Sequence, residues 1–431
     1  MRLFIGEKNQ VFAFKQKIYQ YLRNYKDDFV LLDSHAYSDF PYARYDLLLG
    51  IRLKRYIFPV APQGNFDELE SALHEFSNQW KFGFLSYDLK NAVENLESEQ
   101  PDYLNFPDFA FVIPEIVINI DINGYLECKG ENAAEIFQII QEQVFEESEL
   151  VLPTVSFENR ITFETYEKRI QQIKEHIRLG DIYEINFCQE FFAEQIFLEN
   201  NFQLFEKLCQ LNPSPFSAFL RVGDWEVISA SPERFLTKQG EKLISQPIKG
   251  TLPRGRDIEE DQLFSQMLLN SEKDRAEHVM IVDLVRNDLT FYAEVGSIQV
   301  EELFGIYTFP QVIQMISTIT AQLTDKNLGF AALQKAFPMG SMTGAPKIRA
   351  MELIDQMESQ KRSIFSGALG YINPDGDFDF NVLIRSFYYN RKRKYLSYST
   401  GGAIVYDSSV EDEYQESLLK AKVIENLFGR K

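Results

Sequence analysis

Apolar residues recur every three or four positions in several parts of the chain, the spacing of a helix that buries one face. The clearest case starts after Thr162 and stops at Gly180, residues suited to the two ends of a helix. Its apolar positions are Phe163, Tyr166, Ile170, Ile173 and Ile177. The same spacing predicts one long helical stretch over Ile258–Leu289 and a last helix over Val410–Leu427.

Shorter alternating or wholly apolar runs predict strands. They lie at Phe216–Arg221, Val227–Ala230, Ser366–Ile372, Phe378–Tyr389 and Tyr395–Val405. The turn sequence Asn373-Pro374-Asp375-Gly376 separates two of them, so these neighbours are expected to be antiparallel. Strands and helices are grouped rather than strictly alternating. The pattern therefore favours a layered α+β architecture over a parallel doubly wound sheet.

The length of 431 residues, with 45% hydrophobic residues, exceeds what one hydrophobic core usually holds. The expected division lies near Pro153, before the helix that begins after Thr162. Residues 1–150 are expected to form an N-terminal region that packs on a catalytic region, residues 151–431.

The charge balance excludes several classes of partner. A net charge of -20 would repel nucleic acid and anionic membrane surfaces, so neither is expected to bind. No signal peptide or apolar span is recognisable, and the three cysteines lack paired spacing, so a cytoplasmic protein is expected. With only four histidines, a metal site would depend on oxygen ligands, which favours Mg²⁺ over zinc.

Two pairs of carboxylates have helical spacing. Asp274 and Glu277 are three residues apart, as are Glu413 and Glu416, so each pair shares one helix face. If the two helices face each other, these carboxylates suit Mg²⁺. The alternative is that each pair is a solvated surface, and spacing alone leaves both interpretations open.

Lys249 stands in the unusual segment Gln246-Pro247-Ile248-Lys249-Gly250-Thr251. It is either an ordinary surface lysine or a desolvated one that, near a metal or a cation, loses its proton easily and acts as a nucleophile. Glu233 precedes it by a length that a hairpin could span, which makes this carboxyl group a candidate acid or base. The alternative for Glu233 is an ion pair with Arg234 or another arginine.

Two glycine-containing segments are candidates for lining a pocket. The segment 340–347 lacks the order of glycine, lysine and hydroxyl residue found in a nucleotide phosphate loop, yet Thr343 and its glycines could face a ligand. In Thr400-Gly401-Gly402-Ala403, backbone amides could approach a carboxylate, the alternative being a plain strand end.

The order of these motifs over roughly residues 160–425 resembles the chorismate-utilising enzymes. The resemblance implies a layered αββα sandwich of antiparallel sheets flanked by helices. It also implies an Mg²⁺-dependent enzyme, with the metal held by Glu277 and Glu416 and with Asp274 and Glu413 nearby. Lys249 would be the nucleophile and Glu233 the general acid. The residues that bind chorismate would be Gly250, Thr251, Thr343, Tyr371, Arg385, Gly401, Gly402 and Ala403.

Within that family, the form Pro-Ile-Lys-Gly-Thr looks like the aminodeoxychorismate synthases, whereas anthranilate synthases usually carry alanine in place of the lysine. The lysine that activates water in isochorismate synthases corresponds to Glu184, so water addition is disfavoured. Glu184, Gln314 and Ala403 depart from the residues common in the aminating members. Anthranilate synthesis and a catalytically silent binding subunit are the alternatives.

The resemblance also implies partners and a second pocket. Cys128 lacks the glycine-flanked elbow of glutaminases, so ammonia is expected from a separate glutamine amidotransferase subunit. A tryptophan pocket would be formed by Ser34, Arg44, Tyr45, Asp46, Leu47, Pro213, Ser214 and Pro215. The alternative is that these residues only pack the two regions together.

Overall fold

The computed structural model describes residues 2–35, 37, 40–61, 63–146, 152–199 and 201–428. Every strand pairing in this part of the chain is antiparallel. The strands form two layers that are joined through β5 (Phe109–Asp121), since its first residues pair with β4 and its last with β6.

The first layer contains β5 and the strands on both of its sides. On one side of β5 lie β6 (Tyr125–Lys129) and, at the edge, β1 (Arg2–Phe4). On its other side follow, in spatial order, β3 (Tyr45–Ile57), β2 (Phe29–Asp33), β9 (Phe216–Val222), β10 (Trp225–Ser231), β19 (Ser386–Asn390), β20 (Tyr395–Ile404) and β8 (Glu184–Ala193). The last strand, β8, also pairs with the short strands β7 (Glu158–Asn159) and β16 (Gly344–Ala345).

The second layer continues from the other end of β5. Its strands are β4 (Lys81–Leu85), β17 (Ala368–Ile372), β18 (Phe378–Val382), β11 (Arg234–Gln239), β12 (Lys242–Gln246), β15 (Val312–Gln322), and β13 (Ile248–Pro253) and β14 (Gln299–Thr308) on β15. Apolar residues of both layers, such as Val227 and Tyr388 from the first and Leu236 and Phe380 from the second, belong to one buried cluster. The two sheets therefore pack face to face.

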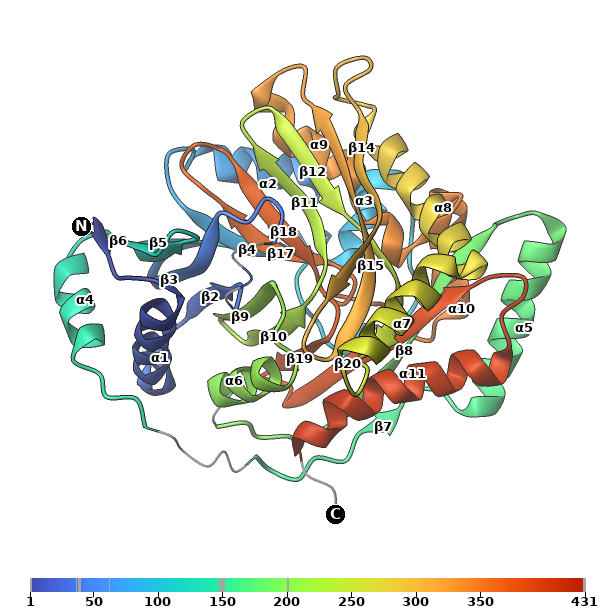
Figure 1. Cartoon of the computed structure of the whole chain (residues 1–431), viewed down its shortest axis with the longest axis horizontal. Helices are drawn as coiled ribbons and strands as arrows, with labels where there is room; N and C mark the ends of the chain where they lie inside the picture. Colours follow the sequence, from blue (N-terminus) through green and yellow to red (C-terminus); the bar gives the residue numbers. More distant parts are fainter. Residues whose placement is uncertain are drawn as a thin grey trace.

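Helices cover the outer faces of this sandwich. The first layer is covered by α1 (Lys8–Asn24), α4 (Ala133–Gln141) and α6 (Asn201–Leu211), and its β8–β20 end by α5 (Phe163–Leu179), α10 (Lys347–Met357) and α11 (Val410–Glu425). The second layer is covered by α2 (Phe66–His74), α8 (Glu272–Leu289) and α9 (Gly329–Ala336). Figure 1 shows α1, α6 and α11 in the lower half and α2, α8 and α9 in the upper half. The predicted α+β sandwich is confirmed.

Two predicted elements are interrupted, and both interruptions shape the site. The single helical stretch expected over Ile258–Leu289 is wrong: α7 (Ile258–Asn270) ends before Ser271, which is extended and caps α8 by accepting a hydrogen bond from the Asp274 amide. The strand expected over Phe378–Tyr389 is divided into β18 and β19, because the chain turns at Arg385, whose φ is 51°. Helix α5 agrees with the pattern, with Thr162 and Gly180 as its caps.

The N-terminal residues contribute strands to both layers. β2 pairs with β9 and β4 pairs with β17, so residues before and after the expected division share the same sheets. The division itself, between residues 150 and 151, lies outside the described residues. No helix in the described part of the chain is long and apolar enough to cross a membrane.

Candidate active site

Lys249 lies on an irregular part of β13, beside α8. The register with β15 shifts between Ile248 and Thr251, so the intervening residues leave the regular ladder. Gly250 has φ +81°, and a Cβ on it would lie 2.9 Å from Leu268 and 3.3 Å from the Asp274 carboxylate. Only glycine fits this close approach without strain, which explains why it follows the lysine.

The amine of Lys249 is buried and paired with Glu184 on β8. Its Nζ lies 2.6 Å from Glu184 Oε1, and the two residues are 9% and 1% exposed. Burial lowers the pKa of Lys249, but the carboxylates of Glu184, Glu277 and Glu233 outweigh burial, so this pKa is raised above its ordinary value. Lys249 is therefore not an ordinary surface lysine, and the anions around it favour its ammonium form, while its role as a nucleophile stays a prediction.

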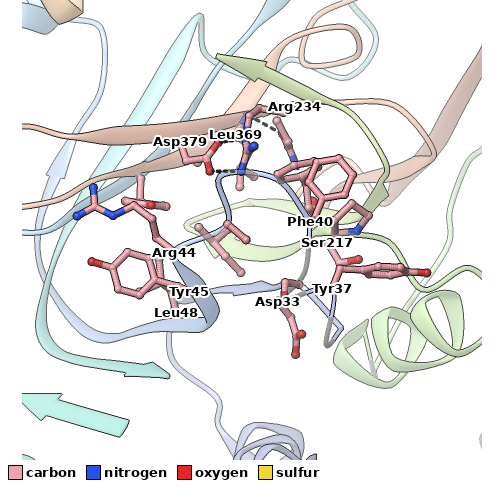
Figure 2. A pocket seen from close by; sticks show the side chains of 18 residues that line it. Asp33, Tyr37, Phe40, Arg44, Tyr45, Leu48, Ser217, Arg234, Leu369 and Asp379 are labelled. Atoms are coloured by element: carbon pink, nitrogen blue, oxygen red, sulfur yellow. Dashed lines mark hydrogen bonds and ion pairs between the residues drawn. The ribbon is translucent and has the colours of Figure 1, made fainter. Parts of the chain in front are cut away.

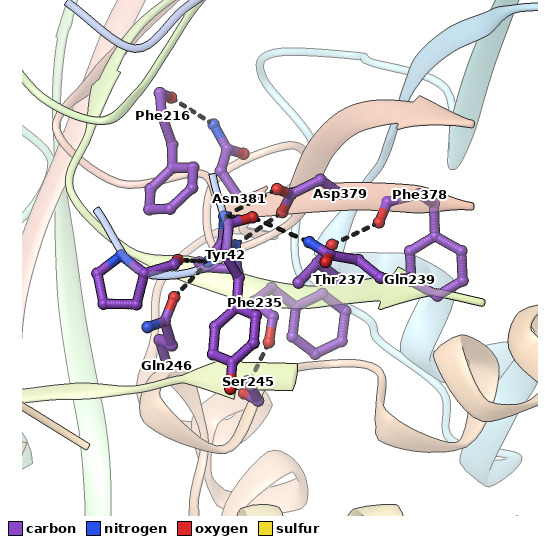
Figure 3. A network of polar contacts seen from close by, with 12 residues as sticks. Tyr42, Phe216, Phe235, Thr237, Gln239, Ser245, Gln246, Phe378, Asp379 and Asn381 are labelled. Carbon is purple, nitrogen blue, oxygen red and sulfur yellow. Dashed lines mark hydrogen bonds and ion pairs between the residues drawn. The ribbon is translucent and has the colours of Figure 1, made fainter. Parts of the chain in front are cut away.

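Glu233 is not used in an ion pair with Arg234. The Arg234 guanidinium makes two hydrogen bonds of 3.0 Å to Asp379 and one of 2.5 Å to Gln246, a network that includes the backbone of Tyr42 (Figure 3). Glu233 is buried in the turn before β11, next to Ser341. Burial raises the pKa of Glu233 to about 7, despite the opposing effects of Ser341 and Lys249. This carboxyl group can therefore hold a proton at neutral pH.

The predicted metal carboxylates lie on α8 and α11, which meet through a lysine. Lys273 Nζ lies 3.9 Å from Glu277 Oε1 and 3.7 Å from Glu413 Oε1. Glu416 is paired with Lys420 at 2.8 Å. Burial raises the pKa of Glu277 to about 7. Among the described residues, no group of three or more His, Cys, Asp or Glu side chains is arranged to hold a metal by itself.

Arg385 is a half-buried arginine beside the Glu233 turn. Its carbonyl accepts a hydrogen bond from the Ala230 amide, while the Glu233 carbonyl accepts one from Val382, so the two segments are held together. The only hydrogen bond recorded for its guanidinium, within the described chain, is a long one of 3.4 Å to Asn212. Burial lowers the pKa of Arg385. A half-buried arginine in such surroundings suits a carboxylate ligand.

The remaining pocket candidates are divided between two places. Thr251 accepts a hydrogen bond of 3.3 Å from Gln314, and buried Thr343 lies on the loop that follows Ser341. Gly401, Gly402 and Ala403 pair with Cys188, Phe187 and Asn186 of β8, and Lys420 donates a hydrogen bond to the Gly401 carbonyl. Tyr371 lies instead in a second pocket, packed against Tyr45 and Trp80.

That second pocket lies between β2, β3, β9 and β17 and has a volume of about 580 Å³, including space open to solvent. Figure 2 shows Asp33, Arg44, Tyr45 and Arg234 around it. Of the predicted tryptophan-pocket residues, those that line it are Ser34, Arg44, Tyr45 and Pro215. Asp46 lies behind it in a buried network with Lys15, and Leu47 points into the core under α1. Pro213 and Ser214 belong to the adjoining loop, whose Pro213 carbonyl lies 3.4 Å from Tyr37 Oη.

The sequence did not indicate two buried residues that stabilise the site, His278 and Arg362. His278 Nε2 lies 2.7 Å from Ser317 Oγ, and Nδ1 lies 3.4 Å from the Lys249 carbonyl oxygen. Arg362 donates to the carbonyl oxygens of Asn186 and Met342 and is paired with Glu358 at 2.6 Å. For His278, the only sign in the sequence of a role at the site is its position directly after Glu277.

A buried lysine influenced by several carboxyl groups, together with a half-buried arginine beside the Glu233 turn, suits an enzyme that acts on a small anion. The chain belongs to the family of chorismate binding enzymes, which matches residues 58–426. The resemblance expected from the motifs is thus confirmed.

Two relatives and one solved structure illustrate the similarity. Aminodeoxychorismate synthase component 1 of Escherichia coli K12 is 38% identical over 346 residues, which cover 79% of this chain and 75% of the relative. Anthranilate synthase component 1 of Thermus thermophilus is 33% identical, with 79% and 76% covered. The crystal structure of anthranilate synthase component I from Streptococcus pneumoniae superposes with a TM-score of 0.78 at 27% identity, covering 89% of this chain and 92% of that one.

Proposed function

We propose that this enzyme aminates chorismate at C4 to give 4-amino-4-deoxychorismate, the reaction of an aminodeoxychorismate synthase component I. The observation that carries the proposal is the buried Lys249 amine, which is paired with Glu184 and influenced by the Glu233 carboxyl group. Anthranilate synthesis adds ammonia at C2 and needs no lysine nucleophile there. Relatives named aminodeoxychorismate synthase component 1, at 38% and 37% identity, support the same choice.

Three residues of the chain, Arg385, Lys249 and Glu233, have distinct roles in the proposed reaction. The Arg385 guanidinium would hold the enolpyruvyl carboxylate of chorismate, since it lies half-buried near the Glu233 turn. The amine of Lys249 would attack C2 while the double bonds shift and the C4 hydroxyl departs. Glu233 would protonate that hydroxyl, because its raised pKa of about 7 keeps a proton available. Ammonia then attacks C4 and releases Lys249.

Substrate would also touch the pocket residues. Gly250, Thr251, Thr343, Gly401, Gly402 and Ala403 would line the ring-binding part of the site with backbone amides and small side chains. Tyr371 packs in the second pocket, so we propose that it acts there by supporting the sheet rather than by touching chorismate.

Magnesium fits the carboxylates of α8 and α11. Glu277 Oε1 is buried and has no hydrogen-bond partner, and Lys273, whose side chain is 57% exposed, already places a positive charge between Glu277 and Glu413. Mg²⁺ usually keeps several waters and takes only one or two protein carboxylates together with substrate oxygens. Glu277 and Glu416 would hold the ion, with Asp274 and Glu413 close by. A magnesium ion held there would place positive charge on the ring carboxylate and so make the ring more electrophilic.

Ammonia would come from a glutamine amidotransferase subunit. The relatives matched here carry the name component 1, which supports a second component. Glutamine-dependent turnover is expected only after such a subunit is added, while ammonium salts support turnover by this chain alone. Glutamine hydrolysis by the isolated chain at the rate of product formation would contradict this part of the proposal.

Product identification separates the two aminating reactions. Chorismate, Mg²⁺ and ammonium are incubated with the chain, and products are identified by mass spectrometry. Retention of the enolpyruvyl group in an aminated product supports C4 amination. Fluorescent anthranilate with free pyruvate would instead support anthranilate synthesis, which the 33% identical Thermus relative keeps as the second candidate.

The second pocket is proposed as an amino-acid site for tryptophan. Its apolar walls, including Phe40 and Tyr45, suit an indole ring, and Ser34 offers an oxygen acceptor for an amino group. The neighbouring Asp33 carboxylate is buried and already bonded to Lys15 Nζ and to the Tyr19 hydroxyl, each at 2.6 Å, so it is not proposed to contact the ligand. Calorimetric titration with tryptophan tests this proposal: saturable binding that Tyr45→Ala weakens is expected, and no heat of binding would contradict it.

A further inference from the structure

Glu184 is placed to exchange a proton with Lys249. Its Oε1 lies 2.6 Å from Lys249 Nζ, which is the distance of a charge-assisted hydrogen bond. Its other oxygen, Oε2, is buried and has no hydrogen-bond partner, so one side of this carboxylate remains open as an acceptor. A buried acceptor without a partner is costly in a resting protein and commonly marks a functional position.

The fold fixes this short distance. Glu184 begins β8, where its backbone pairs with Ala345 of β16. Gly344 has φ +151°, and a Cβ on it would lie 2.2 Å from the Glu184 carbonyl oxygen, so β16 can approach only as glycine. Two residues along β8, the Asn186 carbonyl accepts a hydrogen bond of 2.7 Å from the buried Arg362. Lys249 is held from its other side by His278.

The other charged groups around Lys249 are less well placed to take its proton. Glu233 interacts with Ser341, and no ion pair within 4.0 Å joins Glu233 or Glu277 to Lys249 in the described chain. The titratable groups that influence the amine from the surrounding elements are Glu184 and Cys188 on β8, Glu233 before β11, Glu277 and His278 on α8, and Glu416 on α11.

We propose that Glu184 accepts the proton of the Lys249 ammonium before the amine attacks chorismate and returns it when Lys249 is released. This inference rests on the proposed function. It gives a role to a residue that departs from the aminating relatives. The Lys249 ammonium group must lose a proton before it can attack, because an ammonium group has no lone pair.

The proton balance closes over one turnover. An N–H bond of Lys249 breaks and an O–H bond forms on Glu184. The neutral amine then forms the C2–N bond while the C4–O bond breaks, and Glu233 gives its proton to the departing hydroxyl, which leaves as water. Ammonia forms the C4–N bond, the C2–N bond breaks, and the released amine takes back the proton from Glu184. The new ammonium group on C4 gives one proton to Glu233.

The proposal predicts a specific pH dependence. When the proton moves within the pair, the reactive and resting forms carry the same number of protons, so titration of Lys249 to solvent does not control the rate. In Glu184→Gln the proton must go to solvent, so the neutral fraction rises about tenfold per pH unit below the amine's pKa. As pH rises, the ratio of the wild-type rate to the Glu184→Gln rate should therefore fall about tenfold per pH unit.

The rate to measure is formation of the covalent Lys249 adduct in a single turnover at saturating chorismate and Mg²⁺, without ammonium, by quenched-flow mass spectrometry. Taking the ratio removes the titration of Glu233, which both proteins share. Glu190→Gln is the matched control. Glu190 is also buried on β8 and bonded to Arg160 and Tyr395, so its loss should leave the ratio to wild type constant with pH.

Each outcome decides something. A wild-type protein that forms no adduct contradicts the proposed function. A wild-type adduct together with a constant wild-type to Glu184→Gln ratio overturns the role of Glu184 alone. If Glu184→Gln does not fold, Glu184→Ala is assayed with and without formate. Faster adduct formation with formate, but not with chloride at equal ionic strength, supports the proposal, and no acceleration overturns it.

Discussion

His278 supports Lys249 from behind, with Nδ1 3.4 Å from the lysine's carbonyl oxygen and Nε2 2.7 Å from Ser317 Oγ. Because Glu277 precedes His278 on α8, one turn of this helix carries both the lysine's support and the first metal carboxylate. Replacing His278 with alanine should lower the free energy of unfolding by about 1–3 kcal/mol, since buried polar partners lose their bonds. Urea unfolding measures this loss, and an unchanged midpoint would contradict the packing described.

The same histidine predicts a pH effect on stability. Burial lowers the pKa of His278 to about 4, so the folded protein binds its proton less readily than the unfolded chain, whose histidine titrates near 6.5. The stability due to neutral His278 is therefore present above about pH 6.5 and is lost as pH falls toward 4. Carboxyl groups with raised pKa values, such as Glu233, act in the opposite sense.

The contribution of His278 is isolated by comparing its variant with wild type. The difference in free energy of unfolding between wild type and His278→Ala should shrink as pH falls from 6.5 toward 4. Chemical denaturation at several pH values gives this difference. A difference that grows toward pH 4 would show that the histidine is charged in the folded protein.

Replacing Glu233 with glutamine removes the proposed acid without changing its shape. Adduct formation should slow by about 10²- to 10⁴-fold at pH 6.5. In the wild type the rate should fall as pH rises through about 7, because the carboxyl group then loses its proton. The variant should lack this decline. A wild-type profile without a limb near pH 7, in a protein that forms the adduct, would rule out Glu233 as the acid.

Replacing Arg385 with alanine should weaken chorismate binding. A lost charge-assisted contact costs about 1.5–3 kcal/mol, equivalent to a rise in KM of roughly 10- to 10²-fold. Steady-state kinetics with ammonium measure this change. Arg178→Ala is the control, since that arginine lies on the exposed face of α5 and is paired with Glu175. An equal effect of both variants would contradict a specific role for Arg385.

Replacing Glu277 with glutamine should weaken Mg²⁺ binding. The change removes a buried carboxylate oxygen that has no hydrogen-bond partner, so the dissociation constant should rise roughly tenfold or more. Calorimetric titration with Mg²⁺ in the presence of chorismate measures it without relying on turnover. Unchanged binding in Glu277→Gln would exclude this carboxylate as a ligand.

The pattern of apolar residues was sufficient for the fold class and for most elements, since helix α5 and strands β9, β10, β17 and β20 lie where the spacing predicts them. It failed at Ser271 and Arg385. There a single residue changes the backbone direction without changing the apolar pattern, so a run of uniform spacing conceals two elements.

The candidate site could be predicted in its residues but not in its charges. Lys249 and Glu233 stand out through their local sequence, whereas the Lys249–Glu184 pair joins β13 to β8 across the fold. Only that long-range contact shows that the lysine rests among carboxylates. Likewise, nothing near Arg234 in the sequence indicates that it would bind Asp379 and leave Glu233 to the site.

Lys249 is the central residue of the proposed mechanism, and detecting its covalent bond to substrate is the most direct test of that mechanism. Wild type and Lys249→Ala are each mixed with chorismate and Mg²⁺ in the absence of ammonium, and the intact proteins are weighed by mass spectrometry. Wild type is expected to gain the mass of chorismate less one water, and Lys249→Ala is expected to gain nothing. The same mass gain in Lys249→Ala, or none in a wild type that makes the aminated product, would contradict it.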